Sequence, residues 1–313
     1  MPLRATFLYL SRHRGLRAWA EHAEIARRLS SRFIAGKTLD EALTACQRIR
    51  RQGITATLDY LGENVTTLEE AAASRDMCIR ALRAMREASL EPNVSLKLTQ
   101  FGMDLDANAC EANVSALVET AASIGGFVRI DMEGSAYTDR TLSLVRRIHA
   151  RNGACGAVIQ AYLYRSAHDL PDLIREGIRV RLCKGAYLEP PQVAFEKKAD
   201  VDRHYIGLAH HLLGAASGAT DEHPGYYPAI ATHDERIIDR VERFVVTNGI
   251  DRDTFEFQML YGIRRDLQKR LIADGYRLRL YVPFGEAWFP YFMRRLAERP
   301  ANLLFLLRNL IAA

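Results

Sequence analysis

The sequence predicts an α/β protein folded as a single (β/α)8 barrel. Eight short extended segments recur from about residue 54 onward, and amphipathic helical stretches lie between them. No linker and no change of composition divides the chain. A doubly wound parallel sheet is the alternative, and it is usually accompanied by a glycine-rich nucleotide loop. Because neither GxGxxG nor GxxxxGK(S/T) occurs here, we favour the barrel.

The predicted strands are segments rich in branched and aromatic residues. In order, they are 54–61, 94–101, 127–133, 157–164, 178–183, 228–233, 255–260 and 277–282. Apolar residues at three- and four-residue spacing predict helices between the strands, for example at 107–123, 139–151, 192–217, 235–248 and 262–274. We therefore assign residues 39–313 to the barrel and residues 1–38 to an N-terminal helical extension. Within that extension, 5–33 reads as two short basic amphipathic helices.

The composition is that of a soluble globular protein, with 48% hydrophobic and 26% charged residues among 313. The net charge is +5, but basic residues are interspersed with acidic ones, which favours a solvated surface over a nucleic-acid partner. The five cysteines are scattered without a CxxC pair, which argues against a disulfide framework or a structural zinc site and suits a reducing cytoplasm. No apolar run is long enough to span a bilayer and no signal peptide is apparent.

Polar residues occupy the predicted inner face of the barrel. Side chains alternate along a strand, so Lys97 in SLKLTQF and Arg129, Asp131 and Glu133 in FVRIDME face the interior. The same rule places further polar side chains inside: Gln160, Tyr162, Arg181, His233, Glu256, Gln258 and Tyr281. Burying such groups without partners costs several kcal/mol each, roughly, so the pattern predicts a cavity that binds a polar ligand.

Two adjacent arginines follow the last predicted strand. In YVPFGEAWFPYFMRRLAERPAN, Pro283 and Gly285 end the strand, and a helix carries Arg294 and Arg295. A helix that returns guanidinium groups over a strand end is how α/β enzymes hold a carboxylate or phosphate. With Lys97 and Arg181, these arginines predict a cationic rim for an anionic ligand; the full cationic set is Lys97, Arg181, Arg294 and Arg295.

These residues also have structural interpretations. Lys97, Asp131 and Glu133 could form a structural ion network in the barrel core. Arg181, followed by Cys183 and Lys184, could belong to a solvated cluster at the strand end. Arg294 and Arg295 could lie on a solvated helix face. His233 alone is more often a hydrogen-bonded core residue than a catalyst or ligand. Neither HxH nor HExxH occurs, so no metal site is expected.

Several motifs resemble those of a known family. They are TLDYLGENV, SLKLTQFG, RIDMEGS, VIQAYLYR, RLCKGAY, ATHD, FEFQMLYG and YVPFGEAWFPYFMRRLAERPAN, in this order between residues 54 and 302. The sequence resembles the flavin-dependent proline dehydrogenases, both the bacterial monofunctional enzymes and the corresponding domain of bifunctional proline-utilisation proteins. The resemblance implies a distorted TIM barrel whose final helix lies over the barrel mouth, FAD as the cofactor and L-proline as the substrate.

The resemblance also implies a substrate site. Arg294 and Arg295 would bind the proline carboxylate together with Lys97, and Asp131 would lie beneath the site and hold Lys97. The pyrrolidine ring would be walled by Tyr281, Tyr187 and Leu260. Glu63 would pair with Arg294 as a gate that closes over the substrate. The implied catalytic residues are Arg181, Lys97 and Asp131.

A second group of residues would contact the flavin. Arg181 would donate a hydrogen bond near flavin N5, and Asp131 would also lie at the cofactor. The remaining cofactor contacts would come from Gln160, Lys184, Gly185, Ala186, Thr232, His233 and Gln258. Where the family often has tryptophan after KGAY, this chain has Leu188.

The implied reaction is hydride transfer from proline C5 to flavin N5, which yields Δ1-pyrroline-5-carboxylate in the first step of proline catabolism to glutamate. The family passes the electrons to a membrane quinone. A cytoplasmic protein could reach the membrane through peripheral contact by its basic N-terminal helices. Two alternatives remain open: a Schiff-base lyase that uses Lys97 or Lys184, and a non-catalytic barrel that binds a carboxylate.

Overall fold

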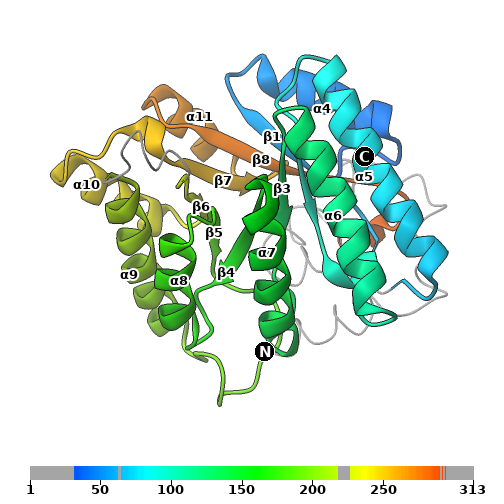
Figure 1. Ribbon diagram of the computed structural model, residues 1–313. Helices are drawn as coiled ribbons and strands as arrows, with labels where there is room; N and C mark the ends of the chain where they lie inside the picture. Colours follow the sequence, from blue (N-terminus) through cyan, green and yellow to red (C-terminus); the bar gives the residue numbers. More distant parts are fainter. Residues whose placement is uncertain (1–31, 63–64, 218–225, 290, 292, 294–313) are drawn as a thin grey trace, which may run out of the picture.

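The protein is a closed barrel of eight parallel strands, seen in a computed structural model that describes residues 32–62, 65–217, 226–289, 291 and 293. The strands pair in sequence order, and β8 closes on β1 (Figure 1). They are β1 (Thr55–Tyr60), β2 (Asn93–Leu96), β3 (Phe127–Ile130), β4 (Cys155–Gln160), β5 (Val180–Cys183), β6 (Ala229–Ala231), β7 (Glu256–Leu260) and β8 (Leu278–Phe284). The predicted (β/α)8 barrel is therefore confirmed.

Helices follow the strands in turn and surround the barrel (Figure 1). They are α4 (Leu39–Arg50), α5 (Leu68–Glu87), α6 (Ala107–Ser123), α7 (Thr138–Asn152), α8 (Ser166–Arg175), α9 (Lys198–Ser217), α10 (Glu235–Thr247) and α11 (Arg265–Ala273). Helices α6, α7, α10 and α11 lie within three residues of their predicted bounds, whereas α9 begins at Lys198, six residues after the predicted start at 192. The sequence analysis gave no bounds for α4, α5 or α8. The buried face of α5 is made largely of Ala, Ser and Cys, which give a weak apolar signal, and α8 contains Pro171, a residue that usually interrupts a helix.

The first described helix begins at a capping box. The Thr38 hydroxyl accepts from the backbone N–H of Glu41, and the Glu41 carboxylate accepts from the backbone N–H of Thr38. These bonds give partners to backbone N–H groups at the start of α4 that have no acceptor within the helix. The helix then packs its buried face against β1 and β8. The proposed extension 1–38 stays a prediction, since residues 1–31 lie outside the described chain.

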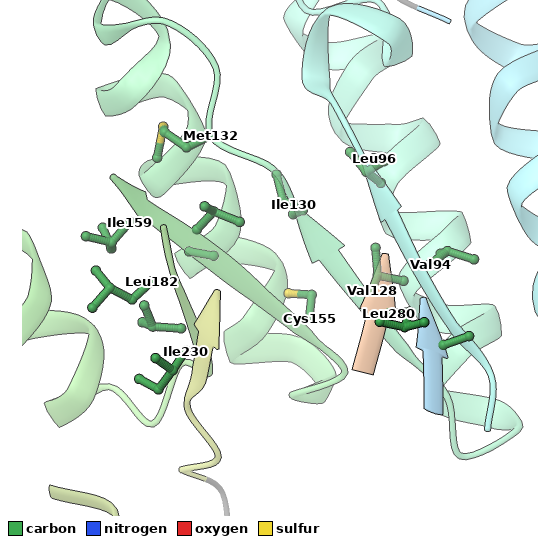
Figure 2. Packing of buried hydrophobic residues seen from close by; sticks show 14 of the residues in the cluster. Val94, Leu96, Val128, Ile130, Met132, Cys155, Ile159, Leu182, Ile230 and Leu280 are labelled. Atoms are coloured by element: carbon green, nitrogen blue, oxygen red, sulfur yellow. The ribbon is translucent and has the colours of Figure 1, made fainter. Parts of the chain in front are cut away.

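One face of each strand is apolar and packs against the helices. Figure 2 shows this set beside the covering helices; its labelled members are Val94, Leu96, Val128, Ile130, Met132, Cys155, Ile159, Leu182, Ile230 and Leu280. All of them are buried. Burial of one large aliphatic side chain contributes about 1.5–3 kcal/mol. The shell between strands and helices therefore supplies the stability that allows polar groups on the other face.

Three strands end at least three residues earlier than the sequence indicated. The prediction of strand 94–101 was wrong beyond Leu96, because residues 98–101 form a 3-10 turn. Strand 127–133 ends at Ile130 and strand 157–164 ends at Gln160. The predicted inward position of Tyr162 was wrong for the same reason. Its ring instead lies over Gly185, packed with Leu163 and Ala194.

Arg129 is buried in the barrel interior and depends on a glycine beside it. Its Nη1 donates to the backbone carbonyls of Ala157 (3.0 Å) and Arg179, and its guanidinium lies 4.9 Å from the Phe127 ring centroid. Burial, together with the charge of Arg181, lowers the pKa of Arg129 to about 9. A Cβ at Gly156 would collide with the Arg179 carbonyl and approach Arg129 Nη1 within 2.8 Å. Gly156 therefore leaves the space that this guanidinium fills.

We expect Gly156→Ala to destabilise the protein by about 1–3 kcal/mol, because the added methyl group meets backbone rather than a flexible side chain. Urea unfolding measures this change in the free energy of unfolding. Gly207→Ala is the matched control. Gly207 lies exposed in α9 with open space around its Cβ position, so alanine there should be neutral or stabilising. Equal stability of wild type and Gly156→Ala would contradict this account.

Candidate active site

Polar side chains from separate strands meet inside the barrel, toward the carboxyl ends of the strands. Arg181 of β5, Asp131 just after β3 and Tyr281 of β8 contact one another. The Arg181–Asp131 contact joins residues 50 apart in sequence, and the Tyr281–Asp131 contact residues 150 apart. Active sites of (β/α)8 barrels lie at this end. The structure thus brings together three residues that the sequence analysis selected, while their roles stay predictions.

Arg181 is held on every side. Nη1 donates to Asp131 Oδ1 (2.7 Å), Nη2 to Ser95 Oγ (3.0 Å) and Nε to Gln258 Oε1 (2.5 Å). The guanidinium carbon also lies 5.2 Å from the Tyr281 ring centroid. With a side chain only 7% exposed, Arg181 is a fixed, desolvated cation. It is not the solvated strand-end residue of the structural interpretation.

Asp131 joins Arg181 to Tyr281. Its Oδ1 accepts from Arg181, and its Oδ2 accepts from the Tyr281 hydroxyl at 2.8 Å. Burial, reinforced by the negative charges of Asp131 and Asp59, raises the pKa of Tyr281 well above its usual range. Tyr281 therefore stays a neutral donor, and its ring is held against the guanidinium.

Lys97 lies against a carboxylate that the sequence analysis missed. Lys97 Nζ lies 3.7 Å from Oδ1 of Asp59, which is fully buried in β1. The resemblance implied that Asp131 holds Lys97. The structure adds Asp59 as a support for Lys97, while Asp131 supports Arg181 and Tyr281. Alternation along β1 could have found Asp59, since it lies two residues after Thr57, which bonds Asn93 of the neighbouring strand β2.

Glu133 and Gln160 brace the loops around this group. The Glu133 carboxylate accepts from the backbone N–H of Thr99 (3.1 Å) and from its hydroxyl (2.7 Å). Gln160 Nε2 donates to the backbone carbonyl of Glu133 at 2.8 Å. These bonds hold the segments after β2, β3 and β4 to one another. Glu133 therefore holds a turn in place, a role that spacing alone did not suggest.

The loop after β5 carries an ion cluster. Lys184 Nζ lies 2.5 Å from Asp202 and 2.8 Å from Asp234, and Lys198 bonds the same two carboxylates. Burial raises the pKa of Asp234, but the hydrogen bonds and charges of Lys184 and Lys198 lower it by more. The net effect is a pKa of about 2. The two aspartates were not predicted. Asp202 belongs to a helix that begins after a long loop, so sequence spacing does not place it beside Lys184.

The rest of this loop approaches other side chains closely. Gly185 has a φ of +115°, and a Cβ there would collide with the Tyr162 ring. Ala186 is exposed and Tyr187 is partly buried. Only glycine can occupy position 185 with this backbone conformation. The backbone after β5 therefore stays close to the barrel mouth.

His233 links two neighbouring strand ends. Its Nε2 accepts from the backbone N–H of Leu260 at 2.9 Å, while the hydroxyl of Thr232 accepts from the backbone N–H of Asp234. Because Nε2 accepts, a neutral His233 carries its proton on Nδ1. This contact favours the structural interpretation of His233 as a hydrogen-bonded residue that ties β6 to β7.

An apolar cluster covers the same end of the barrel. Leu260 and Tyr281 pack against a set contributed by the segments after β1, β7 and β8 together with residues 33–34; the set is Phe33, Ile34, Leu61, Ile263, Trp288, Phe289, Tyr291 and Met293. Trp288 and Phe289 are helical. The segment after β8 therefore folds back over the carboxyl ends of β1 and β7. The final helix that the sequence analysis expects lies largely beyond Met293, outside the described residues, as do Glu63, Arg294 and Arg295.

The described donors fit a flavin cofactor in their chemistry. Arg181, Lys184, Gln160 and His233 bring cationic, amide and imidazole groups to neighbouring strand ends. Such groups match the carbonyls, ring nitrogens and phosphates of FAD. Within the described ranges no group of three or more His, Cys, Asp or Glu side chains could hold a metal ion. None of the helices that the structure describes has the length and apolar character of a membrane span.

Comparisons with known proteins agree on one family. The sequence profile of the family described as "Proline dehydrogenase" matches residues 42–308. Proline dehydrogenase of Deinococcus radiodurans is 43% identical over 288 residues, which cover 90% of each chain. Proline dehydrogenase 1 of Bacillus subtilis (strain 168) is 40% identical over 309 residues, which cover 99% of each chain.

Solved structures agree at the level of the fold. Proline utilization A from Bdellovibrio bacteriovorus, inactivated by N-propargylglycine, aligns with a TM-score of 0.78 and 26% identity over 87% of this chain. A mutant proline utilization A from Bradyrhizobium japonicum aligns with a TM-score of 0.74, and at 23% identity it shows the fold alone. This chain spans about a third of the length of these two proteins, 32% and 30% respectively. Taken with the profile and the full-length relatives, these alignments show that the chain belongs to the proline dehydrogenase family.

Proposed function

We propose that this chain uses FAD to oxidise L-proline to Δ1-pyrroline-5-carboxylate, the first step of proline catabolism to glutamate. One observation carries the proposal: desolvated cations and a neutral tyrosine lie together beneath an apolar cover at the active end of the barrel. Proline combines one carboxylate with an apolar ring, so it needs both kinds of surface. Membership of the family supports the same substrate.

The carboxylate of proline would meet Lys97, whose side chain is 12% exposed and rests on buried Asp59. Arg294 and Arg295, which lie outside the described residues, would complete the clamp as the family motif implies. Tyr281 and Leu260 would pack against the pyrrolidine ring, and Tyr187 would approach it from the loop after β5. A carboxylate held by charge and a ring held by shape leave one orientation for C5.

The buried surroundings also act on the substrate amine. Proline can give up a hydride only when its nitrogen lone pair is free. The water-poor site around Lys97 and Arg181, whose charges are balanced by Asp59 and Asp131, would disfavour an ammonium at that nitrogen because burial penalises the charged form. The chain would therefore promote loss of the amine proton without a dedicated base touching the nitrogen.

When bound, FAD supplies the two-electron acceptor for the hydride. Arg181 would donate to it and offset negative charge, since its guanidinium is already fixed by Asp131, Ser95 and Gln258. Asp131 holds both Arg181 and Tyr281, so it keeps the groups that face cofactor and substrate in a constant relation. Gln160, Thr232 and His233 brace the strand ends beside them.

The loop after β5 would hold the phosphate side of the cofactor through Lys184, Gly185 and Ala186. Lys184 is fixed between two aspartates and would act as a rigid cation. This geometry also argues against the lyase alternative. A Schiff-base lysine is activated by apolar or cationic surroundings, whereas Lys184 and Lys97 each lie beside carboxylates.

Reoxidation of the cofactor would use a membrane quinone, as the family implies. The chain would then be a cytoplasmic protein that touches the membrane from one side. The basic segment between residues 5 and 33 is the proposed contact. It lies largely outside the described residues, so its sequence alone supports this part of the proposal.

An absorbance scan of the purified protein tests the proposed function directly. We expect a flavin band at about 450 nm that bleaches when proline is added without an electron acceptor. A colourless protein that is trapped by borohydride with substrate would instead support the lyase. Proline binding without any absorbance change would support the non-catalytic barrel.

We expect Lys97→Met to raise the KM for proline about 10- to 100-fold, because a charge-assisted contact to the carboxylate contributes about 1.5–3 kcal/mol. Flavin content should stay unchanged. Lys269→Met is the control, since Lys269 is exposed on α11. A KM that is equal in both variants and wild type would remove Lys97 from the carboxylate site.

Asp234→Asn tests the ion cluster through its pH dependence. A pKa of about 2 lies below the ordinary 3.8, so ionised Asp234 stabilises the fold above pH 3.8 and this contribution disappears as the pH falls toward 2. We expect the variant to lose about 1–2 kcal/mol of unfolding free energy at pH 7, after allowing for solvent screening of a side chain that is 22% exposed.

The difference between wild type and Asp234→Asn should shrink steadily below about pH 4, as followed by urea unfolding. Asp200→Asn in α9 is the control, because Asp200 pairs only with the exposed end of Arg203 among the described contacts. It should change stability by less than about 0.5 kcal/mol. A difference for Asp234→Asn that is constant from pH 7 to 3 would contradict the ion cluster.

A further inference from the structure

A buried carboxylate below the active site is connected to Arg181 through one amide side chain. Gln258 Oε1 accepts from Arg181 Nε, and Gln258 Nε2 donates to Glu256 Oε1. All three side chains are buried in the barrel. Glu256 and Gln258 belong to the same inward face of β7, two residues apart, so the strand itself sets their spacing.

The carboxylate determines which way the amide points. Glu256 can only accept a hydrogen bond, so it selects the NH2 end of Gln258. The carbonyl end must then face Arg181 Nε–H, which needs an acceptor. The reversed amide would place its NH2 group against a guanidinium and its oxygen against a carboxylate, and both contacts would be repulsive. The charge of Glu256 therefore fixes the acceptor that Arg181 meets.

Glu256 is itself anchored from below. Arg279 Nε lies 2.8 and 3.1 Å from the two Glu256 oxygens, and Arg279 Nη2 donates to Glu91 at 2.6 Å. Glu256 and Arg279 line a cavity of about 590 Å³ whose walls include the first residues of β1, β7 and β8. The network thus runs from the amino-terminal end of the barrel up to Arg181.

Ser95 supplies a second support from the opposite side. Its hydroxyl accepts from Arg181 Nη2 at 3.0 Å and is buried in β2. Ser95 and Gln258 therefore grip the guanidinium at two different nitrogens, while Asp131 takes the third contact. A long arginine side chain has many rotamers, and three acceptors in fixed positions leave it one.

We propose that Glu256, acting through Gln258, and Ser95 are positioning residues that hold the Arg181 guanidinium in the orientation used for oxidation. The inference rests on the proposed function, in which Arg181 donates to the cofactor. Neither Glu256 nor Ser95 touches substrate or cofactor in this account. Their removal should slow the chemical step and leave substrate affinity nearly unchanged, because the carboxylate site at Lys97 is separate.

The test compares Glu256→Gln, Gln258→Met and Ser95→Ala with a matched control. Thr57→Val removes another buried hydrogen bond of the barrel interior, to Asn93, without touching Arg181. We expect the first three variants to slow flavin reduction in single-turnover experiments by about 10-fold or more, with the KM for proline within about 3-fold of wild type. Thr57→Val should leave the reduction rate unchanged.

A readout that does not depend on turnover comes from the Arg181 side chain itself. In protein freed of cofactor, the 15N resonance of Arg181 Nε–H should show slow exchange with water in wild type and Thr57→Val. It should exchange faster in Glu256→Gln, Gln258→Met and Ser95→Ala, since the guanidinium has lost a fixed acceptor. Ser95→Ala keeps the proposal testable if the loss of the buried charge at Glu256 prevents folding.

A double-mutant cycle separates positioning from general damage. In an Arg181→Lys background, Glu256→Gln should have little further effect on the reduction rate, because the group it positions is gone. Effects that add fully in this background, or an unchanged Nε–H exchange rate in Ser95→Ala and Gln258→Met, would overturn the inference. Failure of the proposed function would show differently, as absence of proline-dependent flavin reduction in the wild-type protein.

Discussion

The ion pair between Arg181 and Asp131 lies inside the barrel at 2.7 Å, with side chains only 7% and 14% exposed. A lone charge in that position would cost several kcal/mol, roughly, so neither side chain can be accommodated without the other. Each partner then organises further groups. Asp131 receives the hydroxyl of Tyr281, and Arg181 draws Gln258 and Ser95 toward it. The polar interior is arranged around this pair.

Such an interior is stable because the two faces of every strand are kept apart. The outer face packs Val94, Ile130, Leu182 and their neighbours against the helices and supplies the hydrophobic stabilisation. The inner face can then hold charges, provided that each meets a partner. Space for such buried charges is limited. The Arg129 guanidinium, for example, fits only because position 156 has no side chain.

Prediction from sequence succeeded where alternation and strand order were enough. Asp131, Arg181 and Tyr281 were placed inside from their positions in three strands, and the structure joins them. It failed where a strand ended early. Tyr162 was expected inside, but β4 ends at Gln160 and the ring turns onto the loop after β5. Local pattern does not show tertiary hydrogen bonds such as that from Thr99 to Glu133, which joins the segments beyond the ends of β2 and β3.

The sequence by itself determined the eight-stranded barrel, the polar character of its inner face and the resemblance to a flavin-dependent family. These follow from periodicity and from motifs, which are local properties of the chain. Only the tertiary structure decided which groups are partners. The fold brings together residues that are far apart in the sequence: Asp59 with Lys97, Asp234 with Lys184, and Glu256 with Arg181 through Gln258. Partner choice depends on distances across the barrel, and no spacing along the chain encodes them.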